Sequence, residues 1–174
     1  MSEWVIGIIG GSGLYALDAL EDAQWIEVAT PWGQPSDALL LGRRTYQIHA
    51  EAFEPMPAGD PFGDMLNKPK KYVVSRTLEK PLWRHTTIIR DDVIESVRAL
   101  KAEPGGSILT DGSSQLVHAL LAHDLVDELH LLLYPLTLGS GKRVFPNGVH
   151  TAFTLLSATP YPSGVVGLHY ARQR

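Results

Sequence analysis

The feature of this sequence that most restricts its fold is an alternation of short apolar runs with helix-like segments between residues 37 and 136. Each apolar run has the length of one strand, and each segment between them places its apolar residues on one face of a helix. Strands joined by helices bury both faces of a parallel sheet. The pattern therefore predicts an α/β fold with three layers, α/β/α, around a mostly parallel sheet. The expected strands are residues 4–9, 24–29, 37–41, 71–75, 85–89, 107–110 and 128–136, and the expected helices are residues 43–53, 91–102 and 113–123.

The end of the chain has a different pattern. Residues 151–160 and 165–172 are strand-like and are joined by a short turn that contains Pro162 and Gly164, which predicts an antiparallel strand pair at the edge of the sheet. Residues 54–63 are rich in proline and glycine and are expected to form a loop.

Composition narrows the function classes. The chain has 174 residues, a formal net charge of -4 and 44% hydrophobic residues, which suits a packed domain that binds a small molecule better than one that binds nucleic acid. It contains no cysteine, which fits a cytoplasmic protein and excludes thiolate ligands. No signal peptide or membrane-length apolar run is visible. The histidines show no metal-ligand spacing, since His118 and His123 are five residues apart and do not share a helix face.

Polar or glycine-rich turns follow three of the expected strands. They contain Gly42, Arg43, Arg44 and Thr45; Ser75, Arg76 and Thr77; and Gly112, Ser113 and Ser114. A helix N-terminus binds anions through its free N–H groups, and arginine suits phosphate oxygens. Each turn also has an ordinary interpretation, as solvated arginines at a helix start, a polar turn, or a serine N-cap.

Four segments together resemble the reductase domain shared by dihydrofolate reductases and the riboflavin-pathway reductase. They are residues 41–46, residues 72–78, residues 109–116 and the stretch from residue 125 to residue 145. The resemblance runs from about residue 37 to residue 172. It implies a dihydrofolate reductase-like fold, NADPH as cofactor, and hydride transfer to a pterin-like or ribosylamino-pyrimidine-like substrate.

The resemblance also implies roles for residues of the three turns. Arg43 would reach the 2′-phosphate of NADPH, while Arg44 and Thr45 would hold the diphosphate. The turn that begins at Ser75 would lie beside the adenine ribose, and the turn that begins at Gly112 would pack its backbone on the diphosphate. The family implies a homodimer that pairs through apolar strands near the C-terminus, and residues 131–134 are apolar enough for such a contact. A buried central strand explains the same four residues without a partner. No proton donor is evident, and Asp37 and Asp111 are poor candidates from sequence alone.

The first 37 residues resemble a different family, the methylthioadenosine phosphorylases, through residues 6–15, 20–22 and 30–37. We expect one domain over residues 1–174, in which residues 1–37 supply the first strand or strands and residues 38–174 form the reductase-like part of an apparent chimera. In the phosphorylases the Gly-Gly-Ser-Gly turn binds phosphate, and this resemblance implies that Ser12 contacts an anion. A catalytically silent nucleotide-binding chimera and phosphate or nucleoside binding by this turn remain alternatives. A weak dinucleotide fingerprint over residues 11–16 is a further one.

Overall fold

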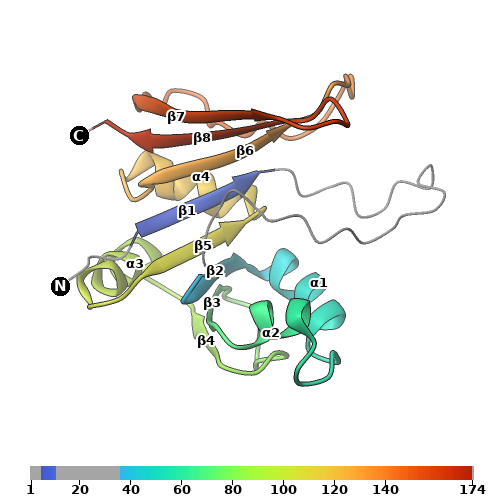
Figure 1. Cartoon of the computed structure of the whole chain (residues 1–174). Coiled ribbons are helices and arrows are strands. Elements are labelled where there is room, and N and C mark those ends of the chain that lie inside the picture. The colour runs from blue at the N-terminus through green and yellow to red at the C-terminus, as the bar shows by residue number, and fades with distance from the viewer. Residues whose placement is uncertain (1–4, 11–35, 174) are drawn as a thin grey trace.

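The structure is a computed structural model that describes residues 5–10 and 36–173. Its centre is one eight-stranded sheet with the order β4-β3-β2-β5-β1-β6-β8-β7. Helices cover both faces of this sheet, so the three-layer α/β/α arrangement is confirmed (Figure 1). The strands are β1 (Val5–Gly10), β2 (Ala38–Gly42), β3 (Lys70–Val74), β4 (Thr86–Ile89), β5 (Ser107–Asp111), β6 (Glu128–Leu133), β7 (Phe153–Pro160) and β8 (Val166–Arg172). The helices are α1 (Arg43–Phe53), α2 (Pro61–Asn67), α3 (Val93–Ala102) and α4 (Ser114–Ala122).

The sheet has a parallel part and an antiparallel edge. Strands β4, β3, β2, β5, β1 and β6 pair in parallel. Strand β8 pairs antiparallel with both β6 and β7. The predicted antiparallel C-terminal pair is thus confirmed, and it joins the same sheet as the parallel strands.

Alternation along β2 divides the core between the two faces of the sheet. Ala38 and Leu40 are fully buried in a cluster with residues of α3 and α4. Leu39 and Leu41 point the other way and pack with Tyr46 of α1. All four side chains are at most 2% exposed, because β2 lies inside the sheet and is covered on both sides.

One expected loop overlaps the start of a helix. Residues 54–63 were expected to be irregular, but α2 begins at Pro61, inside that range. The Asp60 side chain accepts a hydrogen bond from the backbone N–H of Gly63 at 2.6 Å, and Pro61 occupies the first helical turn. An acidic N-cap followed by proline is a favoured helix start. The loop prediction was wrong for residues 61–63 because proline was taken only as a residue that ends a helix.

Strand β1 takes a central place, between β5 and β6. The predicted strand at residues 24–29 and the turn that contains Ser12 lie outside the described residues. Within residues 5–10 and 36–173, no helix is long and apolar enough to cross a membrane.

Candidate functional site

Strands β2 and β5 are parallel neighbours whose chains leave the sheet toward opposite faces. After β2 the chain enters α1, on the face of Leu39 and Leu41, whereas after β5 it enters α4, on the face of Ala38 and Leu40. Ligands of open α/β sheets bind at such a divergence, beside the carboxyl ends of the strands, and we call this edge between β2 and β5 the crevice. Because β3 lies on the other side of β2, the three turns predicted from sequence all follow adjacent strands at this edge.

Two of the three turns are joined directly. The backbone N–H of Gly42 donates to Ser113 Oγ at 2.8 Å, and the N–H of Ser113 donates to Thr45 Oγ1 at 3.3 Å. A Cβ atom at Gly42 would lie 3.3 Å from Ser113 Oγ, so glycine allows this close approach. Gly112 and Ser113 have φ of 58° and 49°, a left-handed conformation that is uncommon for serine. The turns that follow β2 and β5 are therefore held together by hydrogen bonds.

The helix starts at these two turns differ from the other helix starts. Neither α1 nor α4 has a side-chain cap hydrogen bond or an acidic residue in its first turn. In contrast, α2 is capped by Asp60, and α3 carries Glu95 in its first turn. Ser113 occupies the N-cap position of α4 but uses its hydroxyl to hold Gly42, so the ordinary N-cap interpretation does not describe it. Two helix starts with no side-chain cap hydrogen bond and no acidic residue in the first turn favour an anion.

Arginines supply positive charge at the same edge. Arg43 and Arg44 begin α1 and are exposed, and Arg43 Nη1 donates to Gln47 Oε1 at 3.3 Å. Arg76 follows β3, and its Nε lies 3.7 Å from Asp91 Oδ1, with both side chains more than three-quarters exposed. An ion pair this open to water is weak, so Arg76 can turn to another anion at little cost.

The turn that follows β3 is held by hydrogen bonds to the side chain of Ser75. Ser75 is 7% exposed, and its Oγ accepts hydrogen bonds from the N–H groups of Thr77 and Leu78 at 3.2 and 2.9 Å. This bonding fixes the turn and leaves Arg76 and Thr77 exposed. The ordinary interpretation as a polar turn therefore fits Ser75. Arg76 and Thr77 are exposed and can contact a ligand.

A histidine that sequence reasoning missed lies beneath the joined turns. His49 of α1 places its Nε2 3.4 Å from Oδ2 of Asp111, the last residue of β5. The two side chains are 12% and 19% exposed. Burial lowers the pKa of His49, although Asp111 opposes the shift. Burial also raises the pKa of Asp111, against the effects of His49 and of the Gly112 N–H. The pair can hold and exchange a proton at the edge of the crevice.

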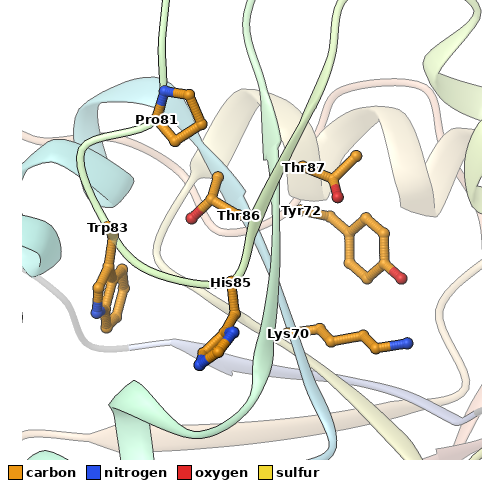
Figure 2. Close-up of a pocket in the computed structure, with 7 residues that line it drawn as sticks. All are labelled: Lys70, Tyr72, Pro81, Trp83, His85, Thr86 and Thr87. Atoms are coloured by element: carbon orange, nitrogen blue, oxygen red, sulfur yellow. The ribbon is translucent and has the colours of Figure 1, made fainter.

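Two hollows of the described structure lie elsewhere. One of about 530 Å³ is lined by Lys70, Tyr72, Trp83 and His85, among others, near the amino ends of β3 and β4 (Figure 2). A second of about 370 Å³ lies along β4 and α3. Neither includes a residue of the three turns. We assign the site to the crevice because ligands of parallel sheets bind at carboxyl ends, and the first hollow is at the opposite ends.

One family model and one curated relative each match most of the chain. The family model of the RibD C-terminal domain matches residues 33–167. The uncharacterized protein YyaP of Bacillus subtilis is 28% identical over 138 residues, which are 77% of this chain and 73% of YyaP.

Solved structures share the fold at low sequence identity. A protein of Shewanella sp. PV-4, assigned to riboflavin biosynthesis by its name, matches 99% of this chain and 100% of its own, with a TM-score of 0.67 and 17% identity. RibD of Acinetobacter baumannii gives a TM-score of 0.58 at 15% identity, over 98% of this chain and 58% of RibD. This chain thus spans little more than half of that RibD.

A short N-terminal match points to a second family. The S-methyl-5′-thioadenosine phosphorylase of Cereibacter sphaeroides is 64% identical over 39 residues, which are 22% of this chain. Those residues are only 13% of the phosphorylase, so most of that enzyme has no counterpart here.

Proposed function

The chain belongs to the RibD C-terminal domain family, and from this premise we propose that it binds NADPH across the carboxyl ends of β2, β3 and β5 as a reductase. The observation that carries the proposal is the junction of Gly42 with Ser113 at the point where the chain leaves the sheet toward opposite faces. Two helix starts without caps or acidic residues flank this junction. They suit a diphosphate, and NADPH carries one.

The fit of the cofactor to these residues extends to its second phosphate. The adenosine 2′-phosphate distinguishes NADPH from NADH, and it needs a cation in addition to the groups that hold the diphosphate. Arg43 and Arg76 are exposed and follow neighbouring strands, so either guanidinium can reach a phosphate at this edge. We propose that Arg43 binds the 2′-phosphate with Arg76 and Thr77 beside it, and that Arg44, Thr45 and the Gly112–Ser114 turn hold the diphosphate.

The chemistry that NADPH supplies when bound is hydride donation to an electrophilic carbon of the substrate. This chain must then provide a proton and exclude water around the reacting atoms. We propose the His49–Asp111 pair for the proton, because its carboxyl group has a raised pKa and lies directly before Gly112. The substrate class that we propose is a pterin-like or ribosylamino-pyrimidine-like ring, whose polar edge such a pair can hydrogen-bond.

We further propose that the protein is a homodimer. Edge strand β7 exposes Leu155 and Leu156 by 50% and 54%, and the stretch after β6 exposes Leu138 by 73%. Both leucines lie on the strand that forms one edge of the sheet, where a β-bulge interrupts the pairing with β8 between Leu155 and Ser157. Apolar groups gathered at one edge favour burial against a second copy.

Arg43→Ala is expected to weaken NADPH binding about tenfold while changing NADH binding much less. The guanidinium is assigned to the 2′-phosphate, which NADH lacks. Titration with each nucleotide, followed by protein fluorescence, measures both dissociation constants. Arg98→Ala is the matched control, since Arg98 is an exposed arginine on α3 that pairs with Glu95.

The outcomes separate the alternatives. Equal affinity of wild type and Arg43→Ala for NADPH would remove Arg43 from the site. No binding of either nucleotide would contradict the proposal and leave the reductase likeness as one of fold. Binding without turnover of any pyrimidine or pterin substrate would favour a catalytically silent chimera.

A further inference from the structure

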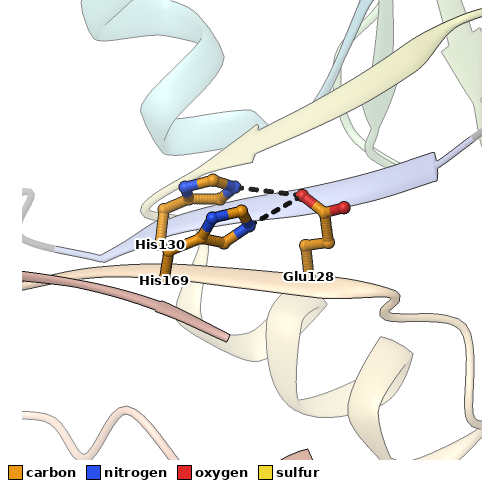
Figure 3. Close-up of side chains that lie close together, drawn as sticks. All are labelled: Glu128, His130 and His169. Atoms are coloured by element: carbon orange, nitrogen blue, oxygen red, sulfur yellow. Dashed lines mark hydrogen bonds and ion pairs between the residues drawn. The ribbon is translucent and has the colours of Figure 1, made fainter. Parts of the chain in front are cut away.

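Three potential metal ligands meet on the antiparallel side of the sheet (Figure 3). Glu128 and His130 are two residues apart on β6, so they point to the same face. His169 of β8 is the register partner of His130 across the antiparallel pair. Leu129, between the two β6 residues, packs in the core with α4. The three ligands therefore project from the face opposite α4.

The ligand atoms of the three residues lie close enough together to share one metal ion. Glu128 Oε2 lies 3.3 Å from His130 Nε2 and 3.1 Å from His169 Nε2, and one ligand atom from each residue lies within 4.8 Å of the others. Zinc bonds to imidazole nitrogen and carboxylate oxygen are about 2.0–2.2 Å long, so neighbouring ligands of a tetrahedron are separated by about 3.3–3.6 Å. The 3.3 Å contact lies at the lower end of this range and the 3.1 Å contact just below it, and in the structure both contacts are hydrogen bonds between Glu128 and the two rings.

The surroundings also suit an ion. The two imidazole rings are stacked, with centroids 4.1 Å apart and an interplanar angle of 19°, and Figure 3 shows both Nε2 atoms directed at Glu128. The side chains of His130, His169 and Glu128 are 10%, 25% and 34% exposed. The site is thus held by two neighbouring strands yet open enough on one side for an ion to enter.

We propose that Glu128, His130 and His169 bind a divalent transition-metal ion, with Zn²⁺ as the best match. Two imidazoles and one carboxylate are a recurrent ligand set for zinc, whereas Ca²⁺ and Mg²⁺ prefer oxygen ligands. Three protein ligands leave a fourth position for water or another small molecule. The ion would tie β6 to β8.

The cluster lies on the same row of the sheet as the proposed proton source. Asp111, Ile9, His130 and His169 are successive register partners across β5, β1, β6 and β8. Two strand spacings separate Asp111 from His130, a distance of roughly 10 Å. The three ligands therefore project from the sheet face that carries the His49–Asp111 pair. The metal site depends on none of the residues assigned to NADPH, so the two proposals can fail separately.

Metal binding is tested on tag-free, EDTA-treated protein without nucleotide. Co²⁺ is titrated while visible absorption is recorded, because tetrahedral Co²⁺ absorbs strongly, and Zn²⁺ is then added as competitor. We expect one Co²⁺ bound per chain, displaced by Zn²⁺, and a melting temperature that rises with added Zn²⁺. His169→Gln and Glu128→Gln are each expected to weaken binding about tenfold or more. His150→Gln, a change at an exposed histidine after β6, is the control and should bind as wild type does.

Absence of stoichiometric binding would overturn the proposal. So would equal affinities of wild type, His169→Gln and Glu128→Gln. Far-UV circular dichroism establishes that each variant is folded. If His169→Gln does not fold, the carboxylate variant decides, because it keeps both rings of the stacked pair.

Discussion

Tyr46→Phe is expected to lower the free energy of unfolding by about 2–3 kcal/mol, because it leaves two backbone N–H groups without their acceptor. The Tyr46 hydroxyl accepts from the N–H groups of Leu82 and Trp83 at 2.9 and 2.8 Å and donates to Thr86 Oγ1 at 3.2 Å. The side chain is fully buried. Urea unfolding of wild type and variant measures the difference.

Tyr72→Phe provides the matched control, since Tyr72 is a half-buried tyrosine on β3 that lines the open hollow of Figure 2. That change is expected to alter stability by less than about 0.5 kcal/mol. A loss for Tyr46→Phe as small as that of the control would show that the two N–H groups find another acceptor. Tyr46 directly follows Thr45, so its hydrogen bonds also anchor the helix that presents the first of the three turns.

Wild type is expected to gain about 1–3 kcal/mol of stability relative to Lys71→Met as pH rises through the interval from about 8 to 10.5. Lys71 is fully buried, its Nζ donates to the backbone oxygen of Asn67 at 2.5 Å, and it lies 4.5 Å from the ring centroid of Trp83. Burial lowers the Lys71 pKa from 10.5 to about 8, with Arg84 adding to the shift and Glu54 opposing it.

The direction of the effect follows from where the proton is lost. Below pH 8, Lys71 is charged in both folded and unfolded chains, and folding must bury that charge. Between about 8 and 10.5 the folded protein releases the proton first, so stability increases with pH and levels off above 10.5. Methionine fills a similar volume without titrating, and comparison with it cancels the other ionisable groups.

Lys70→Met is the neighbouring control, because Lys70 is the exposed residue before Lys71 on β3. Its stability should follow the same pH profile as wild type. Unfolding curves measured at several pH values give each profile. Parallel profiles for wild type and Lys71→Met would contradict the lowered pKa.

Local pattern was sufficient to predict most of the fold. Most of the described strands and helices coincide with the segments predicted from apolar periodicity. This is because a strand or helix that buries one or both faces carries apolar residues at a regular spacing. Helix α2 was missed because proline and glycine outweighed the Asp60-Pro61 start signal in that stretch. The helix predicted for residues 91–102 begins at Val93, since Asp92 takes a left-handed conformation before it.

The candidate site was predictable only in its parts. Strand-to-helix turns identified Gly42 and Ser113, but the bond between them joins residues 71 positions apart and depends on the strand order. His49 has no local signal, because its role arises from contact with Asp111 on another strand. The same holds for His130 and His169, which become neighbours only through the register of β6 and β8. Contacts between residues on different strands therefore cannot be predicted from the local sequence of either strand.

Hydrogen–deuterium exchange with and without NADPH tests the central claim most directly, because it reports where the nucleotide binds. We expect slower exchange in peptides that contain residues 42–46, 75–78 and 112–115, which follow β2, β3 and β5. Peptides from β7, at the far edge of the sheet, should not change. Exchange that stays the same throughout, or protection that avoids these three turns, would contradict a nucleotide site at the crevice between β2 and β5.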